Sequence, residues 1–552
     1  MRERVARAGG ACTAALALLA GCAKSGDSSA GSHGANRFTR PGRFIYAQAQ
    51  DMKSLNPMLA TSGVVGDLSM FLFSWAVRFD EHAKPVPDAL REVPTLENGD
   101  VSRDGLTLTY KLRDNVYFHD GVKMTCADLA FSWRAAMNPA NNNITHDGYS
   151  DIASIDCTNP LVAVVHMKRT YAPFLQQLWS VNGNVPILPA HILAKYNDAK
   201  GSFNTAPYQA APVGSGPFAF VHWRRGQDVE LRAFDRYFLG KPKLRTVVYR
   251  VLPDDSTLVN QLKTHEIDMA ARVGQNVWPE AKNVPGTVAV SAPTYEYDHI
   301  DFNLRRPIFA DVRLRRALAS AIDKRAIVAK IAHGNGDPSD VPISPVLAPF
   351  YNPNTAHYPY DPAGARRALD ALGWKPGPDG IRVRDGQRLA FTYSTQTESA
   401  NGRAIQAFVQ GAWHDVGADV SVKNYPTAQF FENTANGILQ GSKYDVAGFA
   451  WVAAADPDDS SIYSAKNEAP HGQNAIHWTN PLATKAMDDG LATVDPVKRK
   501  AASYREQEQF ALDVPSIILY FRRESFAHNS DLKGFSASPV ISAFWNPHEY
   551  SI

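Results

Sequence analysis

Residues 102–121 read SRDGLTLTYKLRDNVYFHDG. Within this stretch, residues 106–112 alternate β-forming side chains with period two, and Asp104-Gly105 just before them has the composition of a turn. Val116-Tyr117-Phe118 continues the β-forming pattern after Arg113-Asp114-Asn115, which is a second turn signal. The stretch therefore predicts two strands, 106–112 and 116–118, paired as a hairpin.

Helical patterns follow further along the chain. Each predicted helix begins after an aspartate that can cap its first turn, and two of them have proline at the first helical position. The predicted helices span residues 312–332 after Asp311, 362–373 after Asp361, and 496 to about 512 after Asp495, and an apolar strand spans 516–521. Strands and helices are thus mixed without internal repeats, which predicts a mixed α/β fold.

The first residues have the order of a secretory signal. Three arginines precede an apolar stretch, residues 11–20, that is shorter than the roughly 20 residues of a membrane helix. Leu19-Ala20-Gly21-Cys22 is similar to the bacterial lipoprotein box, in which small residues precede a cysteine that receives lipid. We therefore expect a signal peptide over residues 1–21, a lipid on Cys22, and a flexible tether over residues 22–40. The alternative is an ordinary signal peptide with an incidental cysteine.

The composition describes a large chain without a strong charge. Removing residues 1–21 lowers the formal net charge from +2 to 0, so no basic surface indicates nucleic acid as a partner. With 44% hydrophobic residues, 20% charged residues and no second long apolar run, the rest of the chain is expected to fold as one body of two or three lobes.

Two cysteines remain after Cys22. In an oxidising compartment Cys126 and Cys157 can pair, but the sequence does not show whether their Cα atoms come within bridging range. Both a disulfide and two buried free thiols stay open, and we favour the free thiols.

A series of short motifs resembles one family, the solute-binding lipoproteins of peptide-type ABC importers. This family 5 of extracellular solute-binding proteins includes oligopeptide, dipeptide and nickel binders. The motifs run in the family's order from about residue 45 to 525. They are residues 54–57, 102–107, 112–121, 127–132, 212–218, 235–240, 265–268, 309–318, 321–324 and 373–374.

The resemblance implies a two-lobed periplasmic-binding-protein-like fold with an extra inserted domain and a cleft that closes about a hinge. Lobe I would combine residues 41–75, 207–300 and 525–552. The inserted domain II would span residues 76–206, and lobe III residues 301–524. The glycines of Gly214-Ser215-Gly216-Pro217 suit a sharp reversal where two lobes are joined.

The resemblance also implies which segments face the cleft. They are residues 61–64, 295–299 and 448–451 with the residues after them, and in peptide carriers they hold the ligand backbone by strand-like pairing. The residues expected to contact ligand are Ser62, Gly63, Val64, Tyr297, Phe449, Trp451 and Asp456. Phe449 and Trp451 offer stacking surface and Gly63 allows close approach, although each aromatic side chain is equally compatible with an ordinary core.

One position departs from the peptide carriers. They commonly have an aspartate three residues after this tryptophan, where it pairs with the peptide's α-amino group, and this chain has Ala454. Asp456 could substitute or could belong to a solvated turn, and the basic residue that often precedes the tryptophan is also missing. The resemblance therefore leaves open a peptide, a sugar, a metal chelate or another small solute.

Signals of an enzyme are missing. The chain has no Gly-x-Ser-x-Gly elbow, His265-Glu266 lacks the second histidine of a zinc helix, and the cysteines have no metal-ligand spacing. Arg313, Arg315 and Arg316 are more simply explained as capping or paired side chains than as an anion site.

We expect no catalysis, cofactor or metal site. The expected protein is an exported monomer, in the periplasm or at the cell surface and tethered through Cys22, that works with an ABC permease and its ATPase. A tethered sensor or a chaperone-like binder is the alternative.

Overall fold

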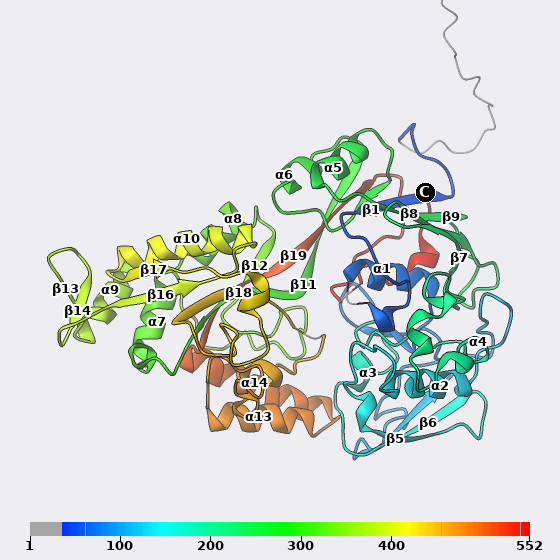
Figure 1. Cartoon of the computed structure of the whole chain (residues 1–552), viewed down its shortest axis with the longest axis horizontal. Helices are drawn as coiled ribbons and strands as arrows, with labels where there is room; N and C mark the ends of the chain where they lie inside the picture. Colours follow the sequence, from blue (N-terminus) through cyan, green and yellow to red (C-terminus); the bar gives the residue numbers. More distant parts are fainter. Residues whose placement is uncertain (1–35, 61, 454, 541) are drawn as a thin grey trace, which may run out of the picture.

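The computed structural model describes residues 36–60, 62–453, 455–540 and 542–552. Figure 1 shows two lobes joined by two long strands, β11 (Thr287–Phe302) and β19 (Ser516–Asn529), which run from one lobe into the other. The predicted strand 516–521 is therefore the first part of a longer strand. The predicted two-lobed α/β fold is confirmed, and Cys22, Thr61 and Ala454 lie outside the described residues.

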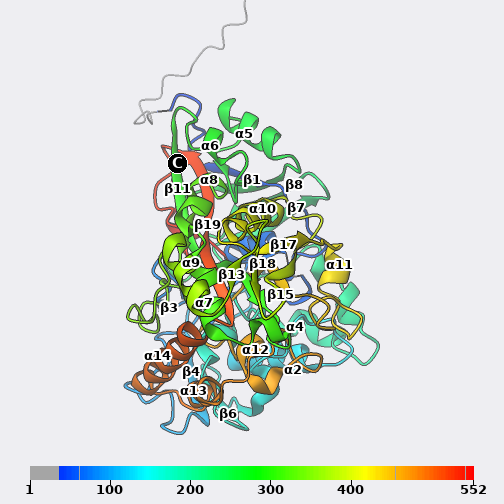
Figure 2. The same ribbon diagram turned by 90° about the vertical axis from the view of Figure 1, so that its left-hand side faces the viewer.

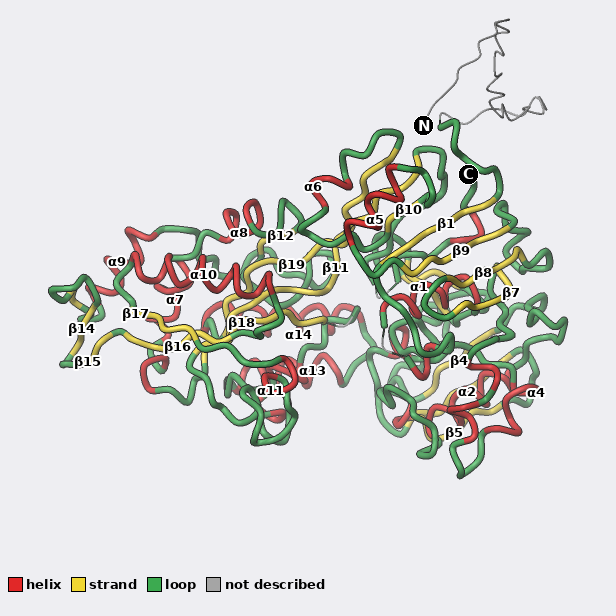
Figure 3. The backbone as a smooth tube through the Cα atoms, turned by 45° about the horizontal axis from the view of Figure 1, so that its top comes forward, coloured by secondary structure: helices red, strands yellow, loops and turns green. Residues whose placement is uncertain are grey.

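One mixed sheet extends through both lobes, as the strands in Figure 3 show. Its order is β17-β16-β18-β11-β19-β10-β1-β9-β8-β7, and β12 pairs with β19 beside this path. The other strands are β1 (Arg43–Gln48), β7 (Phe218–Arg224), β8 (Asp228–Ala233), β9 (Thr246–Val251), β10 (Met269–Ala270), β12 (Gly336–Pro338), β16 (Ala390–Ser394), β17 (Asp419–Val422) and β18 (Val446–Val452).

The ladder between β11 and β19 is interrupted where the chain passes between the lobes. Residues 287–293 pair with 523–529 in lobe I, and residues 297–301 pair with 516–521 in lobe III. The register shifts between Pro293 and Tyr297, so the intervening residues make no regular pairs with β19. This irregular segment lies close to the lobe boundary predicted at residue 300, and the predicted domain boundaries stay predictions.

Lobe I and the inserted segment share one hydrophobic core. The helices on this side are α1 (Gly63–Leu72), α2 (Cys126–Met137), α3 (Phe174–Gln177), α4 (Ala190–Leu193), α5 (Asp255–Lys263) and α6 (Trp278–Ala281). The small strands are β2 (Val77–Phe79), β3 (Pro85–Pro87), β4 (Thr107–Lys111), β5 (Ile152–Asp156) and β6 (Val162–Met167). The first and last described segments meet in lobe I, where Gly42 N donates to Ile552 O.

The predicted hairpin of residues 106–112 with 116–118 is wrong. Strand β4 pairs with β6 instead, from Thr107 opposite His166 to Lys111 opposite Val162. Arg113 turns the chain away, because its backbone N–H donates to Ala89 O and its Nε donates to Asp88 O at 2.8 Å. Val116 and Phe118 are buried in the core, but next to them only an isolated bridge forms, between Tyr117 and Lys123.

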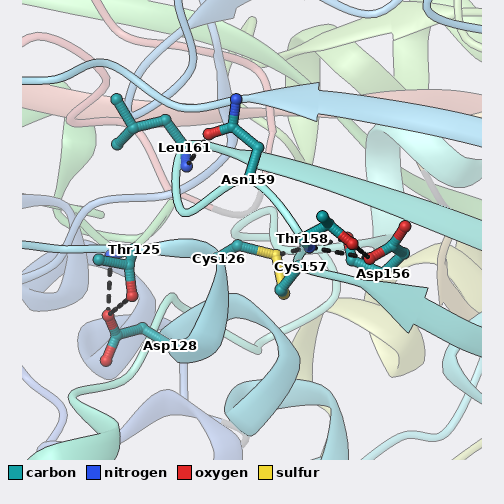
Figure 4. Close-up of a disulfide and its surroundings, with 8 residues drawn as sticks. All are labelled: Thr125, Cys126, Asp128, Asp156, Cys157, Thr158, Asn159 and Leu161. Carbon is teal, nitrogen blue, oxygen red and sulfur yellow. Dashed lines mark hydrogen bonds between the residues drawn. A yellow bond between two sulfur atoms is a disulfide. The ribbon is translucent and has the colours of Figure 1, made fainter.

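The preference for two free thiols is also wrong. Cys126, the first residue of α2, forms a disulfide with Cys157, which follows β5, and their Cα atoms are 5.5 Å apart (Figure 4). The helix start is fixed by Asp128, whose carboxylate accepts hydrogen bonds from the backbone N–H and the hydroxyl of Thr125. The disulfide therefore joins a capped helix to the β5–β6 hairpin.

Lobe III has its own cores on the other side of β11 and β19. Its helices are α7 (Val312–Ser320), α8 (Lys324–Lys330), α9 (Pro362–Ala371), α10 (Ala400–Asp415), α11 (Thr427–Phe430), α12 (Ser460–Tyr463), α13 (Pro481–Leu491) and α14 (Pro496–Asp513). A small sheet contains β13 (Lys375–Pro376), β14 (Arg382–Arg384) and β15 (Gln387–Arg388). In Figure 2, where lobe III faces the viewer, α13 and α14 lie at its base.

Short 3₁₀ turns occur in both lobes and in the inserted segment. They are η1 (Pro57–Leu59), η2 (Tyr149–Asp151), η3 (Ala194–Tyr196), η4 (Ser202–Thr205), η5 (Pro207–Gln209), η6 (Pro307–Phe309), η7 (Ala465–Asn467) and η8 (Pro547–Glu549).

Two of the three predicted helices are confirmed. Asp361 and Asp495 cap α9 and α14 by accepting hydrogen bonds from Gly364 N and Val497 N. The single helix predicted over residues 312–332 is instead two helices, α7 and α8. Asp323 breaks it, because its carboxylate caps a new helix by accepting from Ala326 N at 2.9 Å.

The three arginines of α7 have structural partners, as predicted. Arg313 pairs with Asp311 at 2.8 Å. Arg315 donates to the carbonyls of Asp513 and Val514, and Arg316 donates to that of Leu512. These carbonyls lie at the C-terminal end of α14, so the arginines tie the two helices together.

The glycine-rich loop at residues 214–216 joins the inserted segment to lobe I rather than one lobe to the other. Gly214 O accepts from His119 N at 2.8 Å, and a β-carbon at Gly214 would lie 1.8 Å from Leu72 O.

The lobes touch elsewhere: Ala455 of lobe III packs into the core of lobe I, and Ala453 N donates to Tyr295 O. Within the described ranges, no helix is long and apolar enough to cross a membrane.

Candidate functional site

Strands β11 and β18 place predicted contact residues and their neighbours on one face of the sheet. In their antiparallel ladder Tyr297 lies opposite Trp451, and His299 lies opposite Phe449. Asp301 continues the same face two residues later, opposite Ala447. The sheet therefore places aromatic side chains, an imidazole and a carboxylate next to one another in lobe III.

A cavity of about 270 Å³ lies over this face. Its floor is buried and includes Asp301, Phe449 and Ile476, while Phe431 at its rim is 41% exposed. The lining residues are Asp301, Phe431, Asn433, Leu439, Gln440, Phe449, Trp451, Ile462, Gln473, Ala475 and Ile476. The mixture of a buried apolar floor and a polar, exposed rim is typical of a small-molecule pocket.

Phe449 and Phe431 also line a second cavity. The second cavity has a volume of about 200 Å³, and its lining also includes Asp298, His299 and Arg522. The Phe449 ring packs against the His299 ring with centroids 4.3 Å apart and meets Phe431 at 5.5 Å. Gly448 must be small, because a β-carbon there would lie 2.3 Å from the Tyr393 hydroxyl.

Ion pairs hold the irregular segment between the lobes. Arg522 of β19 donates to both carboxylate oxygens of Asp298, at 2.7 and 2.9 Å, and to Glu296 at 2.6 Å. Although burial alone disfavours the guanidinium charge, the Asp298 and Glu296 carboxylates raise the pKa of Arg522. Burial raises the pKa of Glu296, and Arg522 opposes that rise. The charges of this segment are therefore satisfied within it.

The predicted residues of lobe I line neither cavity. Ser62 precedes α1, Gly63 begins it, and Val64 is wholly buried in the core. A β-carbon at Gly63 would lie 3.6 Å from Cζ of Arg272, whose guanidinium donates to both oxygens of the buried Asp67. Tyr297 is also buried, and its hydroxyl lies 3.1 Å from that of Tyr463. Of the seven predicted residues, the structure brings Phe449 and Trp451 to one cavity and places Tyr297 beside them in the ladder.

Asp456 is neither solvated nor free. It is 3% exposed, and its Oδ1 accepts from Arg499 Nη2 at 2.6 Å. Three further carboxyl groups, those of Asp458, Asp459 and Glu506, lie in the same part of lobe III, and burial raises the pKa of each. Asp456 lies in a bend and accepts from Asp458 N, as the turn alternative predicts, but the turn is buried rather than solvated. The charge of Asp456 is balanced by Arg499 of α14.

The sequence reasoning missed several cavity residues. Asp301 had a usable signal, because it continues the alternation that begins at Tyr297 and passes through His299. Phe431, Asn433, Gln440 and Gln473 come from irregular segments with no local pattern. Among the described residues, no three His, Cys, Asp or Glu side chains are arranged to hold a metal ion.

The family follows from a match over most of the chain. Residues 54–473 match the profile described as "Bacterial extracellular solute-binding proteins, family 5 Middle". The chain belongs to this family. Membership in an extracellular family places this family 5 protein outside the cytoplasm, and the family is described as one of solute-binding proteins.

Individual relatives share about a quarter of its residues. Protein XP55 of Streptomyces lividans is 28% identical over 466 residues, which are 84% of this chain and 80% of that protein. The oligopeptide-binding protein AppA of Bacillus subtilis is 25% identical over 532 residues, 95% and 94% of the two chains. Among solved structures, NikZ from Campylobacter jejuni in complex with Ni(L-His) has a TM-score of 0.73 and 26% identity, covering 93% of this chain and all of that one.

Proposed function

We propose that this family 5 protein is an exported lipoprotein, anchored through Cys22, that captures a peptide or similar small solute between its lobes and delivers it to an ABC permease with its ATPase subunits. Family membership over residues 54–473 is the observation that carries the proposal. AppA is named for oligopeptides, and NikZ was solved with a nickel–histidine complex, so small solutes of this kind are the first ligands to consider. The protein would act as a monomer without catalysis, cofactor or nucleic acid.

Closure of the lobes would take place about β11 and β19. Their ladder loses its regular pairing between Pro293 and Tyr297, so a bend there breaks few backbone hydrogen bonds. The segment after β18 already touches lobe I through Ala453 and Ala455. Movement about the irregular segment would therefore change the space next to Trp451.

The residues proposed to contact solute come from both lobes. Trp451 and Phe449 would supply the apolar surface of lobe III, with Tyr297 supporting them from the neighbouring strand. Ser62, Gly63 and Val64 would contribute backbone groups from lobe I, and Asp456 would act indirectly through its pair with Arg499. This arrangement recognises the shape of a solute more than its sequence.

A non-peptide solute remains the second candidate, and one observation favours it. Asp456 is the acidic residue nearest to Ala454 in the sequence, and its charge is already paired with Arg499 at 2.6 Å. A peptide α-ammonium at this point would lack the counter-charge that peptide carriers supply there. A sugar or a metal chelate has no such requirement.

Small-angle scattering with peptide addition tests the proposal. A soluble form that begins at Arg37 should show a smaller radius of gyration with a peptide mixture, and an unchanged radius across peptides, sugars and metal chelates would contradict solute-driven closure.

Trp451→Ala should weaken binding about tenfold, because a half-buried aromatic contact is lost. Trp223→Ala is the matched control, since this half-buried tryptophan lies on β7 of lobe I under Arg225. Uptake that needs a permease and its ATPase would separate import from sensing or a chaperone-like role.

A further inference from the structure

The lobe III cavity of about 270 Å³ has one carboxylate, that of Asp301, at its floor. Asp301 is 2% exposed, and its Oδ1 is buried without a hydrogen-bond partner. Of the described residues that line this cavity, Asp301 is the only charged one. Burying an ionised carboxylate costs free energy unless a cation or several hydrogen-bond donors offset the lost hydration.

The nearest ionisable neighbour does not satisfy this carboxylate through a hydrogen bond. His299 Nε2 lies 3.3 Å from Asp301 Oδ1, but both ring nitrogens of His299 and that oxygen lack hydrogen-bond geometry. The Phe449 ring covers His299 and holds the imidazole in this orientation. Asp301 lines the cavity, so its carboxylate lies at the cavity floor with no hydrogen bond to Oδ1.

The other lining groups also fit a ligand that donates hydrogen bonds. Gln440 Oε1 is a second buried acceptor without a partner. An ionised carboxylate accepts hydrogen bonds and donates none. Asp301 Oδ1 and Gln440 Oε1 therefore both need hydrogen-bond donors from elsewhere. Phe431, Phe449 and Trp451 form aromatic walls, which attract a cation through the faces of their rings.

The cavity is large enough for a side chain or a terminal group. Its volume of about 270 Å³ far exceeds the roughly 10–15 Å³ that one water needs. Ala447, opposite Asp301 in the ladder, has only a methyl side chain. The exposed rim at Phe431, Asn433 and Gln473 gives access from solvent.

We propose that this cavity binds a cationic group of the solute, an alkylammonium or a guanidinium, with Asp301 as its counter-charge and Phe431, Phe449 and Trp451 as its walls. The inference rests on the proposed solute-binding function and narrows the solute to a cationic class. It gives this chain a carboxylate for a ligand cation in a different place from Ala454. The α-ammonium of a peptide and a lysine or arginine side chain share this chemistry.

Calorimetry with matched tripeptides tests the inference. The probes are Ala-Xaa-Ala peptides with Xaa as lysine, arginine, norleucine or glutamate, each free or acetylated at its N-terminus to remove the α-ammonium. A peptide that carries a cation should bind about 10- to 100-fold more tightly than its neutral counterpart, because a charged hydrogen bond to Asp301 is gained. Asp301→Asn keeps the shape of the side chain and should abolish this preference.

Two further variants make the result specific. Asp445→Asn removes a carboxylate of the same lobe that pairs with Arg306 outside the cavity, and it should leave the preference intact. Phe431→Leu changes an exposed rim residue without disturbing the core, and it should reduce the preference about two- to fivefold. This second change tests the walls even if Asp301→Asn fails to fold.

The possible results distinguish the cationic site from the proposed solute-binding function. Peptide binding without a preference for cations, or a preference that survives in Asp301→Asn, overturns the cationic site and leaves the binding function standing. Binding by none of the peptides contradicts peptide capture and the inference together.

Discussion

Replacing Arg522 by methionine should destabilise the protein by about 3 kcal/mol, because it breaks the ion pairs of the segment that joins the lobes. Arg522 donates two hydrogen bonds to Asp298, and the Asp298 side chain is 5% exposed. Breaking one partner of a buried pair typically costs about 3–5 kcal/mol, and the Arg522 side chain is 26% exposed, so the lower end applies. Methionine keeps most of the apolar volume of the side chain.

The adjacent residue provides the matched control. Arg523 pairs with Asp337, whose side chain is 43% exposed, and it also donates to Ser291. Exposed ion pairs contribute about 0–1 kcal/mol, so Arg523→Met should cost about 1 kcal/mol. The double variant Asp298→Asn with Arg522→Met should recover part of the loss of Arg522→Met, because no uncompensated buried carboxylate remains at residue 298.

Equilibrium urea unfolding followed by circular dichroism measures these differences. The reasoning is refuted if Arg522→Met loses less than about 1 kcal/mol, or no more than Arg523→Met. A double variant less stable than Arg522→Met alone would also contradict it, since the asparagine should relieve the buried charge.

Three other predictions use different parts of the chain. Replacing Cys126 and Cys157 by serine opens a crosslink across 31 residues and should lower the free energy of unfolding by about 3–4 kcal/mol, and unchanged unfolding with and without reductant would count against this. Burial, reinforced by Asp459, raises the pKa of Glu506, so the folded protein retains protons that the unfolded chain releases, and stability is lost as the pH rises. Glu506→Gln should therefore raise the melting temperature at about pH 8 and change it little at about pH 4, and equal shifts at both would show that the carboxylate is not the cause. Cys22→Ser should release the protein from membranes in cell fractionation, and continued retention would refute the lipid anchor.

Local signals in the sequence were sufficient where a single residue governs a structure. Asp361 and Asp495 begin α9 and α14 because a carboxylate can satisfy free N–H groups in a helix's first turn. Asp323 had the same capping chemistry, but the apolar periodicity around it concealed the break between α7 and α8. The family motifs correctly indicated two lobes because they extend through almost the whole chain.

The remaining features depend on contacts between distant residues. Strand β4 pairs with β6 rather than with residues 116–118, and no local pattern decides between two possible partners. Asp456 meets Arg499 from 43 residues away, so its environment was not visible in the loop. Of the residues that line the candidate cavity, Phe449 and Trp451 could be predicted, since they lie in a segment that the family resemblance places at the cleft. The other walls include irregular segments around residues 433 and 473.

Native mass spectrometry of the soluble form that begins at Arg37 tests solute capture most directly. The protein purified from its own cells should carry a non-covalent mass in the folded state that disappears on unfolding, and fragmentation of the released solute should show a cationic small molecule or peptide. Identical folded and unfolded masses, both as purified and after incubation with a peptide digest, would contradict the account that this chain is a solute-binding protein with an occupied site.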